Sequence, residues 1–248
     1  MFYEKLQITI SQYVRKLKLS KSALQLRDTS VKIIDIAYQY GFDSVDGYQR
    51  AFYKEFGVNP YQYSKHPSPL YLFPPYKIYS EIGERKMSEV KTVFVSQIVK
   101  PERKVLIKRG IKADNYWDYS NEVGCDVWGL LTSMPSLSGE PVCMWLPKQY
   151  IKPSTSLYVQ GVEVPTDYQG EIPEGFDVIL LPEATYLMFT SEPFEEVDYE
   201  NAILNVWDAM GKYNPNVLGY VWDEDNPRIQ LEPIGHRGYI ELKAVKKK

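Results

Sequence analysis

The 248-residue sequence has little cysteine and little histidine. Its two cysteines, Cys125 and Cys143, are too few for the disulfide framework of a small secreted protein, which favours a cytoplasmic location. Its two histidines, His66 and His236, leave few ligands for a zinc site or a triad enzyme. No apolar run approaches the roughly 18 residues of a membrane span, and the first residues lack a signal-peptide pattern. The sequence therefore predicts a cytoplasmic protein with no metal, no cofactor and no membrane partner.

Charge and tryptophan are distributed unevenly along the chain. Residues 1–77 hold 11 Lys and Arg against 6 Asp and Glu, a net charge of +5, whereas residues 78–248 hold 18 against 26, a net charge of −8. All five tryptophans lie in the acidic part. We expect a basic domain over residues 1–65 and an acidic domain over residues 91–248, joined by a proline-rich linker over residues 66–90. A basic domain of this kind suits a polyanion such as DNA.

The basic part has the apolar spacing of consecutive helices. A first helix is expected over residues 9–27, and Ser30 is the expected N-cap of a second. Gly41 is expected to end that second helix, and Ser44 to cap a third. A short last helix is expected to begin at Asn59-Pro60. Two short helices joined by a glycine-containing turn are typical of a helix-turn-helix.

In such a motif the N-terminal residues of the second helix face the base edges in the major groove. The residues in this position are Val45, Asp46, Gln49 and Arg50. Arg50 suits a guanine, Gln49 an adenine, and Val45 a thymine methyl group. Two observations weigh against this assignment. Phosphates repel Asp46, and Arg50 can instead pair with Glu55 or Asp46 on the surface.

The stretch IIDIAYQYGFDSVDGYQRAFYKEFGVNPYQYSK, residues 33–65, resembles the second helix-turn-helix of AraC/XylS-type transcription regulators. In that family two such subunits read successive segments of the major groove. FYEKLQITISQYV, residues 2–14, resembles the end of the first recognition helix and the start of the helix that follows it. The resemblance implies that this chain begins inside that helix, at Met1–Lys5, and lacks the first subunit. Weak, salt-sensitive DNA binding is expected, because each lost phosphate contact lowers the affinity steeply.

The acidic part changes from helical to alternating periodicity. Two helices are expected, over residues 114–134 and 195–213. Strands are expected over residues 104–109, 142–146, 156–164, 176–181, 185–189, 218–223, 228–233 and 238–245. Each half is β-α-β-β in outline. The sequence therefore predicts an α+β protein, in which an incomplete all-α helix-turn-helix unit is joined to an α+β domain of two pseudo-symmetric β-α-β-β repeats.

Several segments of this part resemble the GyrI-like effector-binding domain over about residues 91–246. They are EVGCDVWGLL (122–131), YVQGVEVP (158–165), PEGFDVILLPEATYLMF (173–189) and PRIQLEPIGHRGYIELKAV (227–245). The resemblance implies a cleft between the two halves, lined by aromatic residues, with a buried glutamate that meets lipophilic cations. Glu232, in the penultimate expected strand, matches that glutamate, and Glu163 is a second candidate carboxylate. A buried carboxylate needs a partner charge, which a flat cation supplies while its face attracts aromatic rings.

The candidate walls of this cleft are the aromatic residues on the strands that we expect to border it. They are Trp145, Tyr158, Tyr220 and Trp222. Trp128 and Trp207 lie on helical stripes, which favours the core for both. Arg228 and Arg237 are alternative, purely structural partners for Glu232.

The two resemblances together predict a ligand-responsive transcription regulator. A lipophilic, cationic small molecule would occupy the C-terminal cleft and modulate DNA binding by the N-terminal helix-turn-helix. Two alternatives remain open. One is a stand-alone drug- or toxin-binding protein that sequesters its ligand, and the other is a GyrI-like hydrolase in which the pocket glutamate acts as a general base. The sequence has no GxSxG or HExxH motif, so we assign no catalytic residue and expect a protein that is not an enzyme.

Overall fold

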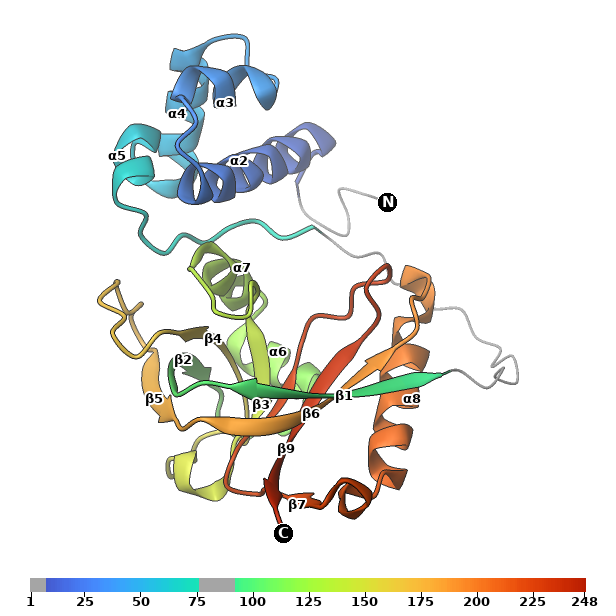
Figure 1. Ribbon diagram of the computed structural model, residues 1–248. Helices are drawn as coiled ribbons and strands as arrows, with labels where there is room; N and C mark the ends of the chain where they lie inside the picture. Colours follow the sequence, from blue (N-terminus) through green and yellow to red (C-terminus); the bar gives the residue numbers. More distant parts are fainter. Residues whose placement is uncertain (1–7, 76–91) are drawn as a thin grey trace. The chain divides into compact units, whose positions relative to one another are not determined.

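The computed structural model describes residues 8–75 and 92–248, which form two compact units (Figure 1). Among the described residues, the helical unit comprises residues 8–75 together with residues 125–134, and the sheet unit comprises residues 92–124 and 135–248. The expected end of a first recognition helix at Met1–Lys5 lies outside the described residues.

In its described residues, the helical unit contains four consecutive helices and a fifth from a distant part of the chain. They are α2 (Ile10–Asp28), α3 (Ile33–Gln39), α4 (Val45–Phe56), α5 (Pro60–Lys65) and α7 (Asp126–Ser133). The first four confirm the expected helices, with one correction. Ser30 is not the N-cap of α3, because that helix begins at Ile33 and Lys32 takes the N-cap position.

Local sequence explains the turn between α3 and α4 and the end of α4. Gly41 has a φ of 71° and Gly57 a φ of 72°, a left-handed conformation that glycine adopts without steric cost. The Ser44 hydroxyl accepts a hydrogen bond from the Gly47 N–H at 3.1 Å and so caps the start of α4. These contacts fix where the second helix of the helix-turn-helix begins.

A small apolar core holds α2 to α5 together. Its fully buried side chains are Leu19, Ala23, Leu26, Ile36, Ala37, Tyr48, Phe52 and Tyr63. The Tyr48 hydroxyl donates a hydrogen bond to Ser22 at 3.1 Å, which satisfies a buried polar group inside this core.

Part of the expected linker packs on this core. Leu70 and Leu72 are buried in it, and the Phe73 ring meets Tyr13 edge to face at 5.4 Å. Leu72 and Phe73 therefore dock on the helical unit, whereas Tyr71 remains 62% exposed. Residues 76–91 lie outside the described residues.

Helix α7 completes the helical unit. Gly129 packs so closely on Leu72 that a Cβ at this position would clash with the Leu72 carbonyl oxygen. The Ser133 hydroxyl accepts a hydrogen bond from the Leu70 N–H at 2.8 Å. The Arg27 guanidinium donates to the carbonyl oxygens of Thr132 and Met134, which satisfies acceptors at the C-terminal end of α7. The helical unit is thus built from two separate stretches of sequence.

The described residues of the sheet unit form a nine-stranded antiparallel sheet with two α-helices, α6 (Tyr116–Val123) and α8 (Tyr199–Lys212). Its strands are β1 (Val93–Lys100), β2 (Arg103–Arg109), β3 (Val142–Trp145), β4 (Tyr158–Val164), β5 (Asp177–Leu181), β6 (Ala184–Ser191), β7 (Tyr220–Trp222), β8 (Arg228–Gln230) and β9 (Ile240–Lys247). Short 3₁₀ helices are η1 (Lys148–Tyr150), η2 (Glu196–Asp198) and η3 (Pro215–Leu218). The strand order is β1-β6-β9-β8-β3-β4-β2-β5, and β7 pairs with β9.

This order is pseudo-symmetric about the β3–β8 pair, which lies at the centre of the sheet. The first strand of each half crosses to the other half, so that β1 pairs with β6 and β5 pairs with β2. The α+β class is confirmed, but the β-α-β-β outline is corrected in both halves. The first half has a leading strand, β1, that was not expected, and the second half has two strands, β5 and β6, before its helix and three, β7, β8 and β9, after it. The sequence analysis missed β1 because most of its residues are exposed, which removes the alternating pattern.

The expectation of a single helix over residues 114–134 is also wrong. The chain leaves the helical conformation at Gly124, where φ is 89°, and forms α6 and α7 instead. Within the described ranges, no helix combines the length and the apolarity that crossing a bilayer requires.

Candidate functional site

The exposed start of α4 is the candidate nucleic-acid surface of the helical unit. Asp46 and Arg50 are exposed, Gln49 is half-buried, and Val45 packs partly against the apolar core. Glu55, the alternative partner of Arg50, forms an ion pair with Lys16 at 2.5 Å. The structure thus leaves the Arg50 side chain on the surface of the helix that the motif directs into a groove.

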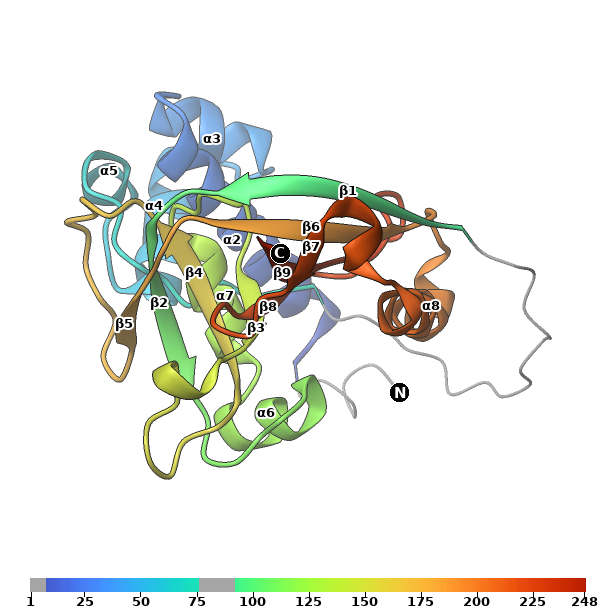
Figure 2. The same ribbon diagram turned by 60° about the horizontal axis from the view of Figure 1, so that its bottom comes forward.

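A second candidate site lies at the centre of the sheet unit, on the face that carries α6, which packs on β4, and α8, which packs on β6 (Figure 2). Its members are brought together by the strand register, in which Trp145 pairs with both Tyr158 and Arg228. We call this site the aromatic cluster. It consists of Trp145, Tyr158, Trp207, Arg228, Tyr239 and Glu241.

Glu241 on β9 is the carboxylate of the aromatic cluster, and its side chain is fully buried. It accepts hydrogen bonds from Trp207 Nε1 and from the Tyr239 hydroxyl, each at 2.6 Å. Arg228 Nε donates to its other oxygen and forms an ion pair with it. Three donors from three different elements therefore converge on one buried charge.

Arg228 supplies the cation of the aromatic cluster. Its guanidinium carbon lies 4.3 Å from the centre of the Trp145 ring and 5.3 Å from that of Trp207, both within cation–π range. Its side chain is 29% exposed. One nitrogen, Nη2, is buried without a hydrogen-bond partner in the described part of the chain.

Two tyrosines complete the cluster as neutral donors. Burial holds the pKa of Tyr158 and of Tyr239 well above 10, and the adjacent Glu241 charge adds to this effect for Tyr239. The Tyr158 hydroxyl donates to Gln230 Oε1 at 3.0 Å, and its ring meets Trp145 at 4.9 Å and Tyr119 of α6 at 5.6 Å. The cluster can therefore offer aromatic faces and one carboxylate to a flat cation.

Glu163 is not part of this site, which corrects the expectation of a second cleft carboxylate. Glu163 and Tyr158 are five residues apart on β4, so their side chains lie on opposite faces of the sheet. Glu163 forms ion pairs with Arg103 at 2.5 Å and Lys100 at 2.7 Å, and it accepts a hydrogen bond from the Ser138 hydroxyl. Although burial alone would raise it, the pKa of Glu163 lies below 4.5 because of these two cations.

Glu232 lies outside the strand in which it was expected, because β8 ends at Gln230. Its backbone N–H donates to Glu140 at 3.2 Å, and its carbonyl oxygen accepts from Arg237 at 2.7 Å. Arg237 also forms an ion pair with Glu140. The suggested pairing of Arg228 with Glu232 is replaced by the pairing of Arg228 with Glu241.

The four expected wall residues separate into two groups. Trp145 and Tyr158 belong to the aromatic cluster. Tyr220 and Trp222 lie on β7, where they pack against the core under α8, and the Lys243 ammonium lies 4.5 Å from the Trp222 ring centre.

The sequence analysis missed Trp207, Arg228, Tyr239 and Glu241 as site residues. Trp207, which was expected in the core, is 39% exposed and bonded to Glu241. The sequence pattern that could have identified Glu241 is the alternation in YIELKAV, residues 239–245. It places Glu241 on the inward face shared with Tyr239 and Val245, where a charge needs a partner.

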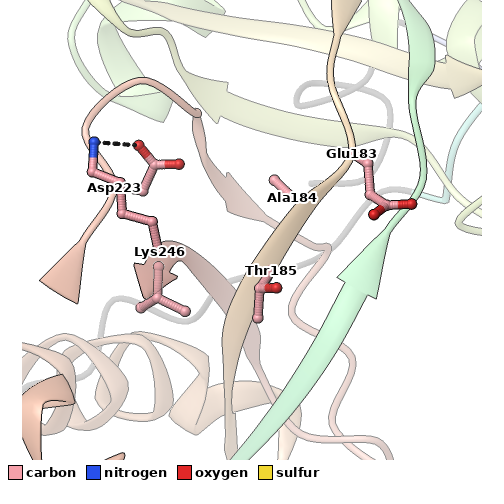
Figure 3. A pocket seen from close by; sticks show the side chains of 6 residues that line it. Glu183, Ala184, Thr185, Asp223 and Lys246 are labelled. Carbon is pink, nitrogen blue, oxygen red and sulfur yellow. Dashed lines mark ion pairs between the residues drawn. The ribbon is translucent and has the colours of Figure 1, made fainter. Parts of the chain in front are cut away.

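A separate hollow of about 220 Å³ lies elsewhere in the sheet unit. Figure 3 shows its lining, in which Lys246 reaches Asp223 at 3.4 Å. The other lining residues are Glu183, Ala184, Thr185 and Val245. None of the six belongs to the aromatic cluster, and the hollow is open and polar, so the cluster remains the stronger candidate. Among the described residues, no group of three or more His, Cys, Asp or Glu is placed to hold a metal ion.

Comparison with known protein families places residues 1–66 in a family described as "Helix-turn-helix domain". Two relatives are the right origin-binding protein of Escherichia coli, 41% identical over 95 residues, and the transcriptional regulator Rob of Salmonella typhimurium, 41% identical over 80 residues. These matches cover 38% and 32% of this chain, and only 32% and 28% of the relatives' own lengths. They confirm the AraC-type resemblance of the N-terminal part.

Comparison with solved structures gives weaker likenesses. The C-terminal domain of EcmrR has a TM-score of 0.40 at 15% identity, over 64% of this chain and 100% of that domain. The protein SAV2435, bound to tetraphenylphosphonium, has a TM-score of 0.36 at 13% identity, over 63% of this chain and 94% of that protein. At these scores the likenesses support no conclusion about function.

Proposed function

From the helix-turn-helix family to which residues 1–66 belong, we propose that the chain is a ligand-responsive transcription regulator. The helical unit binds DNA, and the sheet unit is a GyrI-like domain that binds a lipophilic cation at the aromatic cluster. The observation that carries the DNA-binding half is the 41% identity to the right origin-binding protein over 95 residues. Ligand binding alters DNA binding by shifting the population of conformations that differ in DNA affinity.

Exposed Arg50 on α4 supports base readout by the helical unit, with Gln49 and Val45 beside it. Arg50→Ala is expected to weaken binding to the preferred sequence about tenfold, because a good paired contact to guanine contributes roughly 1–3 kcal/mol. The preferred sequence is first enriched from a pool of randomised duplexes and then titrated by fluorescence anisotropy at several salt concentrations. Binding should weaken as salt rises.

Lys112→Ala is the matched control, since it removes an exposed positive charge from the sheet unit and should leave DNA affinity unchanged. If no sequence is enriched over random DNA, the regulator proposal is wrong, and sequestration of a ligand becomes the better account.

The aromatic cluster supports the ligand-binding half, because it combines a fully buried carboxylate with two tryptophan faces. Glu241→Gln is expected to weaken binding of tetraphenylphosphonium at least about tenfold, since the buried negative charge is lost. Calorimetric titration measures this affinity.

The affinity of Glu232→Gln for tetraphenylphosphonium is measured in parallel, because Glu232 is the carboxylate that the family resemblance indicates. A loss confined to Glu232→Gln would move the site to that residue and toward the other expected walls, Tyr220 and Trp222. Unchanged affinity in both variants, each shown to be folded, would contradict cation binding altogether.

A further inference from the structure

We infer that the Arg228 guanidinium occupies the cation position of the aromatic cluster, so that a cationic ligand binds by displacing it from Trp145 and Trp207. This inference rests on the proposed function and adds to it the rule by which the site selects its ligand. Arg228 acts as a specificity-determining residue, because a ligand must compete with a cation that the chain itself supplies.

The geometry of Arg228 is that of a bound ligand. Its guanidinium is a flat, delocalised and weakly hydrated cation, which is the chemistry expected of the effector. It lies 4.3 Å from the Trp145 ring centre and 5.3 Å from the Trp207 ring centre, and its Nε bonds Glu241. The aromatic faces and the carboxylate that would recognise an external cation are therefore already engaged.

Charge balance requires displacement rather than simultaneous binding. Glu241 carries one negative charge, and its other two donors, Trp207 and Tyr239, are neutral. With Arg228 in place the cluster has no net charge. A second cation among the same rings would be a desolvated positive charge without a counterion, which is strongly unfavourable.

Arg228 is also held loosely enough to leave. Its side chain is 29% exposed, in contrast to 1% for Arg103 in the other buried ion pair. It is the first residue of the short strand β8, and its Nη2 has no hydrogen-bond partner in the described part of the chain. When it rotates into water, the head group regains the hydration that this nitrogen lacks.

The ligand class follows from this exchange. A successful ligand must replace the charge of Arg228 and must also bury more apolar surface than the guanidinium does. Lipophilic monocations meet both requirements. Neutral aromatic molecules supply no replacement for the charge on Glu241 and should bind weakly.

The test is calorimetric titration of tetraphenylphosphonium into the full chain and its variants. Arg228→Gln removes the competing cation and is expected to bind at least about tenfold more tightly than the wild type. The matched control is Lys243→Gln, which removes the same charge from beside Trp222, two residues along β9 from Glu241. Its affinity is expected to stay within about twofold of the wild type, since it opens no position in the cluster.

Arg228→Gln leaves a buried carboxylate without its cation and therefore lowers stability. Arg228→Lys gives a second, milder variant, because an ammonium is compact and strongly hydrated and stacks less well on two rings. It is expected to bind about threefold more tightly than the wild type. Tetraphenylphosphonium should also raise the melting temperature of Arg228→Gln more than that of the wild type, because the ligand then supplies the missing charge.

The outcomes separate this inference from the function on which it rests. If Glu241→Gln abolishes binding while both Arg228 variants bind no more tightly than the wild type, the displacement inference is overturned and cation binding stands. If Glu241→Gln has no effect either, the ligand-binding half of the proposed function fails. If benzoate binds the wild type more tightly than tetraphenylphosphonium and loses affinity in Arg228→Gln, Arg228 is the partner of an anion and displacement is again overturned.

Discussion

Glu163 on β4 and Glu241 on β9 are both fully buried, but on opposite faces of the same sheet. Glu163 is paired with two cations, Arg103 and Lys100, of which Arg103 is almost completely buried. Glu241 is paired with one cation, the partly exposed Arg228, and its remaining donors are a tryptophan and a tyrosine. Burial alone therefore does not distinguish a functional carboxylate from a structural one.

The two carboxylates differ in whether the cation paired with each can be replaced by another cation. Removing Arg103 from Glu163 would require an almost completely buried side chain to leave the core, so that arrangement serves stability. Removing the cation from Glu241 requires only that a partly exposed arginine rotate outward, and aromatic faces are left for the molecule that replaces it. A partly exposed partner between aromatic rings is thus the better sign of a ligand site.

The largest effect expected from this comparison is on stability. Glu163→Gln should lower the free energy of unfolding by about 3–5 kcal/mol, because it leaves Arg103 charged and buried without a counterion. Glu241→Gln should lower it by only about 1–3 kcal/mol, since Arg228 can reach water. Urea unfolding followed by circular dichroism measures both. Equal losses would show that the two carboxylates do not differ as described.

A smaller effect is expected in acid. Because the two cations hold the pKa of Glu163 below 4.5, this carboxylate contributes stability at higher pH, and the contribution is lost as the pH falls through its folded-state pKa. The stability of the wild type should therefore decrease more steeply between about pH 5 and about pH 3 than that of Glu163→Gln.

Urea midpoints measured across this range test the expectation. Asp177, Glu122 and Asp223 also have lowered pKa values, but they contribute equally in both proteins and cancel in the comparison. Parallel curves for the two proteins would contradict the account of Glu163.

The helical unit was largely predictable because its signals are local. Ser44 and Asn59-Pro60 mark helix starts through contacts with residues a few positions away, and both were correctly assigned. The N-cap at Ser30 failed because Lys32 starts α3 without any side-chain cap, so no local signal marks that boundary.

The candidate site was less predictable because it depends on strand register. Trp145 and Tyr158, both expected as walls of the cleft, are cross-strand partners. Arg228 and Glu241 meet them only because β8 lies between β3 and β9, which no local pattern specifies. Glu163 was misassigned because a shift of one residue along a strand moves a side chain to the other face.

Helix α7 has a consequence for the order in which this protein is assembled during synthesis. The ribosome releases α2 to α5 first, but their unit includes a helix encoded after β1, β2 and α6. Until Asp126–Ser133 has emerged, Leu70 and Leu72 lack the contacts of Gly129 and Ser133, and Arg27 has no carbonyl oxygens of α7 to bond. The part of the chain that is made first is therefore completed only after the second unit has begun to emerge.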